Sequence, residues 1–306
     1  MKLWTEEYRP DSVDGYVFAD ENQRAVVQGW IDSEAIPNLL FSGAAGVGKT
    51  TLARILIKAL DIDPYDVLEI NASRENSVDT IRDKISGFVE TMPFGKFKIV
   101  LLDESDYISP NGQAALRNLM ETYHQTARFI LTCNYPHKVI PALHSRCQGF
   151  HVDKVDLTEF TARAATVLVT ENIEFDLDTL DVYVRSTYPD LRKCLNALQQ
   201  NSTTGKLISS SSGADSGGEW KIRAVELFKA GKPTDARKVI CAAVRPDEMD
   251  AAFTWLYQNL DLWSSDPDIQ DEAIKLIRDG VARIPLIGDA EINLAGTLVE
   301  LAQLIR

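Results

Sequence analysis

The eight residues from 43 to 50, Gly-Ala-Ala-Gly-Val-Gly-Lys-Thr, constrain the fold of this chain more than any other segment. They match the phosphate-binding pattern G-x-x-x-x-G-K-[ST], which has physical meaning only between a strand and a helix. Residues 39–41 form a short apolar run, and apolar residues recur at helical spacing through 51–60. Because strand, glycine loop and helix follow one another in the required order, we expect this segment to bind ATP.

Each part of the loop has a chemical role. Glycines let successive backbone N–H groups face the phosphate oxygens, and the N-terminus of the following helix favours anions. Lys49 adds a positive charge near the β- and γ-phosphates, and Thr50 offers a hydroxyl to Mg²⁺. A chance match is the alternative, but the correct flanks argue against it. The residues expected to contact the nucleotide here are Gly43, Ala44, Ala45, Gly46, Val47, Gly48, Lys49, Thr50 and Thr51.

An acidic pair follows a second apolar run. Residues 99–102 are all apolar, as in a strand buried on both faces of a parallel sheet, and they lead into Asp103 and Glu104. We expect Asp103 to hold Mg²⁺ and Glu104 to orient or deprotonate the attacking water. An acidic turn after a core strand is the alternative, and the glycine loop makes the catalytic interpretation the better one.

Length and charge narrow the functional classes. A chain of 306 residues is long enough for two or three domains. Its net charge of −13 argues against non-specific coating of DNA, so any DNA contact must be a narrow basic stripe. The sequence shows neither a membrane-length apolar run nor a secretion signal, which predicts a cytoplasmic protein with no membrane partner. The four cysteines are widely dispersed along the sequence, which argues against a structural zinc site.

The pattern of apolar residues changes along the chain. Expected strands at 39–41, 67–70, 98–102 and 128–132 alternate with helical patterns at 78–89 and 113–123, which is typical of a parallel α/β sheet. After about residue 155 only helical patterns remain, interrupted by a polar stretch rich in glycine and serine. We therefore expect an α/β domain at 1–154, a small helical domain at 155–200, a flexible linker at 201–218 and a second helical domain at 219–306.

Six short segments occur in the order typical of one family. They are Tyr8-Arg9-Pro10, the glycine loop, Asp103-Glu104, Asn134, Ser145-Arg146-Cys147 and the run Pro189-Asp190-Leu191-Arg192-Lys193. In this order the chain resembles AAA+ clamp-loader ATPases, namely the small subunits of replication factor C and the large clamp-loader subunit of T-even-type bacteriophages. The segments cover residues 1 to about 200. The resemblance implies a P-loop (AAA+) α/β domain, a helical lid domain and an all-helical C-terminal collar domain.

The resemblance also implies roles for single residues. Asn134 corresponds to a polar sensor that holds the attacking water, although an Asn after a strand is otherwise a common turn former. Arg146 corresponds to an arginine finger presented to the nucleotide of a neighbouring subunit, the alternative being an ordinary surface arginine. Arg192 corresponds to a second sensor that reaches the nucleotide from the lid, the alternative being a residue at a helix start. The remaining nucleotide contacts implied are Tyr8, Arg9 and Pro10.

DNA contacts are implied for the segment after the second strand. A helix N-terminus there would follow the phosphates of the template strand without reading bases. A solvated helix with local ion pairs is the alternative, because acidic residues interleave with the cations. The implied DNA contacts are Arg74, Ser77, Arg82 and Lys84, and the helix containing residues 113–117 is expected to couple neighbouring sites.

These roles together imply a clamp-loader function. ATP and Mg²⁺ would be the cofactors, and the partners would be a sliding clamp, primer–template DNA, further copies of this chain and a different clamp-loader subunit in a five-membered assembly. The implied enzyme is an ATPase stimulated by DNA and clamp. Two alternatives remain: another AAA+ machine, such as a branch-migration motor or protein remodeller, and a scaffold that binds nucleotide without hydrolysing it.

Overall fold

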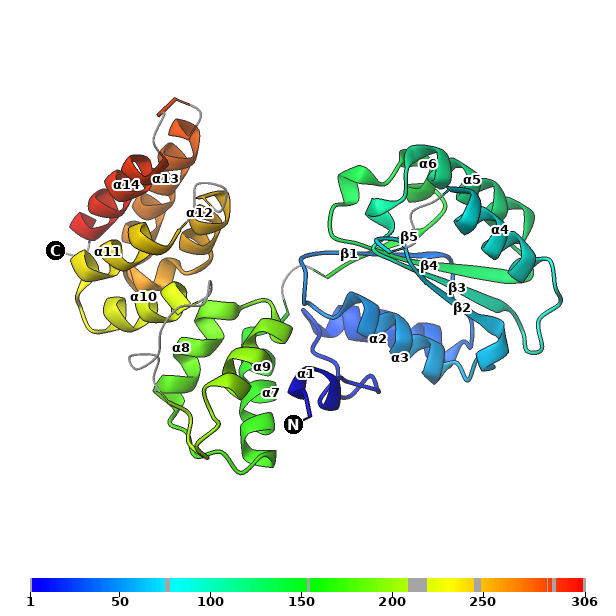
Figure 1. Cartoon of the computed structure of the whole chain (residues 1–306), viewed down its shortest axis with the longest axis horizontal. Helices are drawn as coiled ribbons and strands as arrows, with labels where there is room; N and C mark the ends of the chain where they lie inside the picture. The colour runs from blue at the N-terminus through cyan, green and yellow to red at the C-terminus, as the bar shows by residue number, and fades with distance from the viewer. Residues whose placement is uncertain are drawn as a thin grey trace. The chain divides into compact units, whose positions relative to one another are not determined.

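The computed structural model describes residues 2–74, 78–152, 155–208, 219–244, 249–284, 286–287 and 290–304. The chain divides into two compact units, Met1–Val167 with Pro189–Asn196, and Leu168–Tyr188 with Ala197–Arg306. The first unit contains a β-sheet and the second is helical (Figure 1). The domain boundaries expected after residues 154, 200 and 218 stay predictions. No helix in the described ranges combines the length and apolar character that crossing a membrane requires.

The sheet of the first unit has five strands that are all parallel. They are β1 (Leu39–Ser42), β2 (Val67–Asn71), β3 (Lys98–Asp103), β4 (Ala127–Cys133) and β5 (Gln148–His151). Their order across the sheet is β2-β3-β4-β1-β5, with every neighbouring pair parallel. Because β1 lies beside β4 rather than β2, the loop that leaves β1 lies next to the carboxyl end of β4. This order puts segments that are distant in sequence at one edge.

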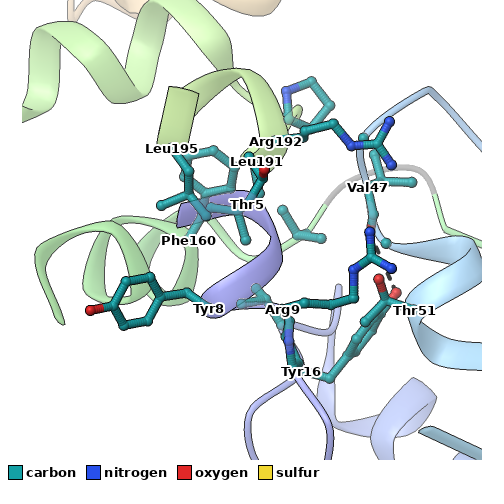
Figure 2. A pocket seen from close by; sticks show the side chains of 16 residues that line it. Thr5, Tyr8, Arg9, Tyr16, Val47, Thr51, Phe160, Leu191, Arg192 and Leu195 are labelled. Atoms are coloured by element: carbon teal, nitrogen blue, oxygen red, sulfur yellow. Dashed lines mark hydrogen bonds between the residues drawn. The ribbon is translucent and has the colours of Figure 1, made fainter. Parts of the chain in front are cut away.

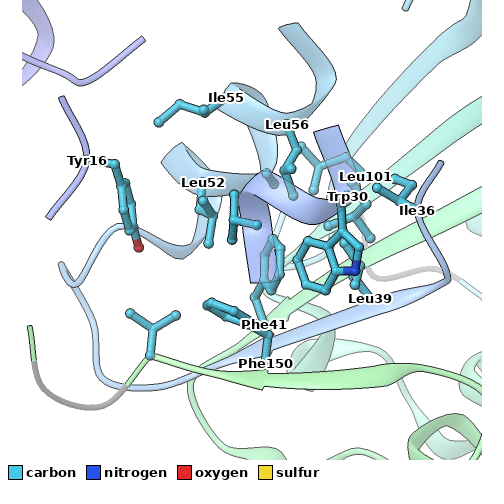
Figure 3. Close-up of a cluster of buried hydrophobic side chains, with 14 of the residues drawn as sticks. Tyr16, Trp30, Ile36, Leu39, Phe41, Leu52, Ile55, Leu56, Leu101 and Phe150 are labelled. Carbon is cyan, nitrogen blue, oxygen red and sulfur yellow. The ribbon is translucent and has the colours of Figure 1, made fainter. Parts of the chain in front are cut away.

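Helices cover both faces of the sheet, as Figure 1 shows. One face packs against α2 (Glu21–Asp32) and α3 (Lys49–Ala59), and the other against α4 (Val78–Val89), α5 (Pro110–Thr122) and α6 (Pro141–His144). On the first face, the ring centroids of Phe41 and Phe150 lie 5.6 Å apart with an angle of 69° between the ring planes, and the ring of Trp30 in α2 packs against Phe150 (Figure 3). Burial on both faces explains why β1, β3 and β4 are almost continuously apolar.

The remaining elements are helices. A short helix α1 (Trp4–Glu7) begins the chain, and α7 (Leu157–Thr170), α8 (Leu177–Thr187) and α9 (Leu191–Gln200) follow the sheet. The last helices are α10 (Glu219–Lys229), α11 (Pro233–Ala243), α12 (Met249–Gln258), α13 (Pro267–Arg283) and α14 (Ala290–Leu304). Trp220 and Trp255 pack edge to face at 5.2 Å, and both are buried together with Trp263. These tryptophans therefore form the core of the second unit.

The parallel α/β domain followed by helical regions confirms the fold class expected from the sequence. Strands β1 to β4 confirm the four predicted strands. The elements that were not predicted include α1, α2, α6 and β5. In β5 only Phe150 is buried and the other three residues are exposed, so its composition lacks the apolar pattern of a strand. Helix α5 begins at Pro110 rather than at the expected residue 113, because Ser109 accepts a hydrogen bond from the N–H of Gly112 and proline suits the first turn.

Part of the expected linker is packed rather than flexible. Leu207 is buried, and its N–H donates to the carbonyl of Glu174 at 2.8 Å. The hydroxyl of Tyr183 in α8 donates to the carbonyl of Ile208 at 2.7 Å. Residues 201–208 are therefore held against the helical unit, because one apolar side chain and two backbone groups find partners there. The rest of the expected linker, 209–218, lies outside the described residues.

Candidate nucleotide site

Three predicted segments meet at the carboxyl edge of the sheet. The glycine loop leaves β1 after Ser42, which pairs in register with Cys133 at the end of β4. Asp103 ends β3, the other neighbour of β4, and Asn134 directly follows β4. Functional side chains in parallel sheets gather at this edge because every strand ends there.

The glycine loop adopts a backbone that other residues would strain. Gly43 has φ +147°, and a Cβ on it would lie 2.0 Å from the carbonyl oxygen of Val152. Gly46 has φ +76°, and a Cβ there would lie 1.9 Å from Oδ1 of Asp190. The same Asp190 oxygen accepts a hydrogen bond from the N–H of Lys193 and so caps the start of α9. The start of helix α9 therefore packs directly against the glycine loop.

Lys49 is buried, and neutral oxygens surround its ammonium group. Its Nζ donates to the carbonyls of Gly43 at 2.9 Å and Ala44 at 2.7 Å, and to Oδ1 of Asn134 at 2.8 Å. Burial lowers the pKa of Lys49, while the carboxylates of Asp103 and Asp106 oppose that shift. The lysine is thus held at the loop by groups that a phosphate oxygen can replace.

Hydroxyl groups converge on Asp103 from two sides. Thr50 and Thr132 each donate a hydrogen bond of 2.6 Å to Oδ1 of Asp103. A hydroxyl and a carboxylate in contact supply the hard oxygen ligands that Mg²⁺ prefers. The donor set therefore fits Mg²⁺, which would be held by Thr50 and Asp103. Bound there, the ion would neutralise charge on the phosphates.

Glu104 has a left-handed backbone with φ +57° and ψ +44°, uncommon for a residue other than glycine. Its N–H donates to Oγ1 of Thr132 at 3.0 Å, and the next residue, Ser105, donates from its hydroxyl to the carbonyl of Thr132 at 2.8 Å. Such strained conformations persist where their surroundings determine them, and they gather at functional sites. Thr132 therefore fixes both members of the acidic pair.

Two adjoining cavities, both within the first unit, lie along the loop and share Gly46, Gly48, Thr51 and Arg192. The polar cavity is further lined by Ala45, Lys49, Thr50, Asp103, Glu104, Thr132, Cys133 and Asn134. The more apolar cavity is further lined by Thr5, Tyr8, Arg9, Pro10, Tyr16, Val17, Val47, Val155, Phe160, Pro189, Leu191 and Leu195. A polar compartment beside an apolar one suits a nucleotide, which has charged phosphates at one end and a flat base at the other.

The expected N-terminal and lid residues line the apolar cavity. Figure 2 shows the guanidinium groups of Arg9 and Arg192 reaching toward Val47 and Thr51. Arg9 also pairs with Glu6 at 2.8 Å. The ring of Tyr8 points away from these two arginines (Figure 2), and its carbonyl accepts a hydrogen bond of 2.9 Å from Arg163 of α7. Tyr8 thus contributes to the cavity wall while α7 holds its backbone.

Arg146 does not join this site. It lies in the short connection between α6 and β5, at the amino end of β5, whereas the glycine loop lies at the other end of the sheet. Its Nε donates to Oε1 of Glu121 at 2.8 Å, its Nη2 contacts the same oxygen, and its Nη1 donates to the carbonyl of Ala142 at 3.0 Å. The strand direction thus separates Arg146 from the nucleotide site of its own chain.

The expected DNA contacts also lie away from the cavities. Arg74 is exposed after β2, and Arg82 and Lys84 are exposed on α4. Arg82 pairs with Asp83 at 3.4 Å. Ser77 lies outside the described residues. The DNA contacts expected at these residues stay a prediction.

Sequence reasoning missed several residues of the site. Thr132 fixes the acidic pair, and Tyr16 lies beneath the loop, where a Cβ on Gly48 would meet its ring at 2.9 Å. Asp106 is buried and accepts a hydrogen bond from the N–H of Tyr135, the residue after Asn134, at 3.2 Å. Only Thr132 carried a usable signal, since it is a polar residue near the end of an otherwise apolar strand.

Comparison with known proteins agrees with this geometry. Residues 39–152 match the family described as "ATPase family associated with various cellular activities (AAA)". The replication factor C small subunit of Methanosphaera stadtmanae is 34% identical over 81% of this chain and 74% of that protein. The one of Methanococcus vannielii is 36% identical over 68% and 67%. Among solved structures, the Thermotoga maritima RuvB Holliday junction branch migration motor has a TM-score of 0.55 at 12% identity, covering 73% of this chain and 78% of that one. This last likeness shows the fold alone.

Proposed function

The chain belongs to the replication factor C small-subunit family of AAA ATPases, and from this premise we propose that it is a clamp-loader subunit in DNA replication. It binds ATP, helps to open a ring-shaped sliding clamp and places the clamp on primer–template DNA. ATP hydrolysis then releases the clamp. The observation that carries the proposal is the meeting of Lys49, Thr50, Asp103 and Asn134 at one end of the sheet.

The site residues divide the chemistry among them. Lys49 exchanges its contact with Asn134 for the γ-phosphate, which frees the Asn134 amide to hold the attacking water. Glu104 accepts the proton of that water or orients it, as its fixed backbone at the strand end allows. Arg192 closes from α9 over the phosphates when ATP is bound, and this gives ATP a preference for the closed state.

We assign Arg146 to the active site of the neighbouring subunit. Its position at the amino end of β5 excludes the nucleotide of its own chain, while a surface arginine at that edge can face another copy. A planar guanidinium suits the charge that develops on the phosphoryl oxygens during transfer. Hydrolysis then depends on assembly of five subunits, some of them copies of this chain and one of them different.

The clamp is expected to dock on an apolar patch made of Tyr65, Met92 and Phe94. Their exposed fractions are 78%, 79% and 78%, and the rings of Tyr65 and Phe94 lie 6.0 Å apart. The patch lies where β2 and β3 begin, at the opposite edge from the glycine loop. Large apolar side chains grouped on a surface mark protein–protein sites. The patch was not predicted, although Met92 and Phe94 are two apolar residues between the expected helix at 78–89 and the expected strand at 98–102.

DNA binding is a further part of the proposal. Arg74, Arg82 and Lys84 would contact phosphates, and repetition around the assembly would add up several modest contacts. Kinship with the large clamp-loader subunit of T-even-type bacteriophages, and with it residence in a host cytoplasm, is likewise a proposal that rests on size and acidity.

The decisive experiment measures ATP turnover by the assembly reconstituted with its companion subunit. Addition of sliding clamp and primer–template DNA together should raise turnover at least tenfold over either alone. A branch-migration motor would instead respond to four-way junction DNA without any clamp, and a nucleotide-binding scaffold would show no turnover. Equal rates with and without the clamp would contradict the proposal.

A further inference from the structure

Two buried charges lie beside the exposed apolar patch. Asp66 is fully buried at the end of the short helical turn Pro64–Asp66, and Lys98 is 3% exposed at the start of β3. Burying an ionised group is costly unless its hydrogen bonds are satisfied. Neither residue touches the nucleotide site, so their burial requires another reason.

Lys98 binds the end of α4. Its Nζ donates to the carbonyl of Phe88 at 3.0 Å and to the hydroxyl of Thr91, and it lies 4.3 Å from the centre of the Phe88 ring. The last carbonyls of a helix have no partner within the helix, and a cation there also offsets the helix dipole. Lys98 therefore fixes the point at which α4 ends and the loop with Met92 and Phe94 begins.

Asp66 binds the other end of the same loop. Its Oδ2 accepts a hydrogen bond of 2.7 Å from the N–H of Gly95, one residue after Phe94. Its Oδ1 is also buried and has no hydrogen-bond partner among the residues that the structure describes. A carboxylate kept in this position at the cost of one unsatisfied oxygen indicates that the bond to Gly95 matters. Tyr65, whose ring lies 6.0 Å from that of Phe94 in a tilted arrangement, is the residue next to Asp66.

We propose that Asp66 and Lys98 are positioning residues that hold the 90–96 loop at both ends, so that Met92 and Phe94 stay exposed in the one shape that fits an apolar pocket of the sliding clamp. Without them, an exposed apolar loop would fold its side chains back on its own surface. A loop held in its bound shape also loses less conformational entropy on docking. The proposal rests on the proposed function, because the clamp is the partner that it names.

The test is clamp affinity of the reconstituted assembly with ATP, measured for a small set of variants. Lys98→Met keeps the apolar stem and removes the ammonium, and Thr91→Val removes one of its acceptors with little change in volume. We expect Lys98→Met to weaken clamp binding about tenfold and Thr91→Val to weaken it less. Lys96→Met is the matched control, since Lys96 lies in the same loop but is exposed and forms an ion pair with Glu34. It should bind the clamp like the unaltered chain.

A double-mutant cycle separates positioning from general destabilisation. If Lys98 acts through the patch, Lys98→Met should have almost no further effect in a Phe94→Ala background. An equal loss in both backgrounds, or unchanged clamp binding by Lys98→Met and Thr91→Val, would overturn the proposal. If Lys98→Met does not fold, Thr91→Val and Asp66→Asn decide, with faster hydrogen exchange of the Gly95 amide as the expected sign of a released loop. If the unaltered assembly does not bind the clamp, it is the proposed function that fails.

Discussion

The ammonium group of Lys49 lies 2.8 Å from Oδ1 of Asn134, although 85 positions separate the two residues in the chain. The contact links the phosphate-binding loop to the residue after β4, and the parallel order β4-β1 makes it possible. Each residue gives the other a hydrogen-bond partner. In the proposed function a phosphate oxygen replaces Oδ1 of Asn134 on the lysine, so that phosphate binding is coupled to release of the Asn134 amide.

Replacement of Asn134 by Ala should separate binding from hydrolysis. ATP affinity should change little, because Lys49 keeps two carbonyl partners and remains free to bind phosphate. Turnover by the assembly should fall roughly 10²-fold, the usual effect of removing one well-placed polar group. Fluorescent-nucleotide titration and a phosphate-release assay measure the two quantities. Equal losses in both would assign Asn134 to ground-state binding instead.

Glu104→Gln should trap the nucleotide. Glutamine has the same size as glutamate, and the backbone N–H of residue 104 still donates to Oγ1 of Thr132. The side-chain amide, however, cannot accept a proton. Turnover should fall by roughly 10² to 10⁴, and ATP should stay bound and unhydrolysed in the purified assembly. Chromatography of the extracted nucleotide checks this. Recovery of mainly ADP would show that another group serves as the base.

Arg146→Ala should remove DNA-stimulated hydrolysis and leave ATP binding nearly intact. A finger supplied by a neighbour contributes roughly 10³ to 10⁵ in rate, whereas its own chain's nucleotide is not in reach. Arg278→Ala is the control, since Arg278 is exposed and forms an ion pair with the neighbouring Asp279. Dilute single subunits that hydrolyse ATP as fast as the assembly would exclude a shared active site.

Gly46→Ala should weaken ATP binding as well as the fold. The added Cβ meets Asp190 at 1.9 Å in a left-handed backbone, so the cap of α9 must move. The free energy of unfolding should fall by about 1–3 kcal/mol. Gly205→Ala is the comparison. Gly205 also has a left-handed backbone, with φ +81°, but a Cβ added there would meet no atom within 4 Å, so this variant measures the cost of backbone strain alone. Urea unfolding and nucleotide titration of both variants make the comparison, and identical behaviour would rule out a steric role for Asp190.

The thiols of Cys133, which is buried, and Cys147, which is partly buried, predict a loss of stability at alkaline pH. Burial raises the pKa of Cys133 to about 11 and that of Cys147 to about 12. A thiol in the unfolded chain has a pKa of about 8.5. As the pH rises, the unfolded state therefore loses its thiol protons at a lower pH than the folded state. The contribution of these thiols to the free energy of unfolding is therefore complete below the pKa of the unfolded thiol. It is lost progressively as the pH rises from there to the pKa values of the folded state. A Cys133→Ala, Cys147→Ala variant should lose less stability than the unaltered chain between pH 8 and 10.5, as urea unfolding would show.

The sequence alone was sufficient for the glycine loop, the acidic pair and the alternation of strands and helices. These features depend on residues adjacent in the chain, so spacing and side-chain type determine them. Helix α2 and strand β5 were not predicted, because neither has a strong periodic pattern of apolar residues. The edge strand β5 buries only Phe150 and owes its conformation to pairing with β1.

Only the tertiary structure decided which distant residues meet. The order of the strands brings Thr132 onto Asp103 and Asn134 onto Lys49, and strand direction puts Arg146 at the far edge. The buried Asp66 and Lys98 could be recognised only once their partners were in place. Local spacing specifies chemistry within one turn or loop, whereas hydrogen bonds across the sheet depend on chain topology, which no short segment encodes.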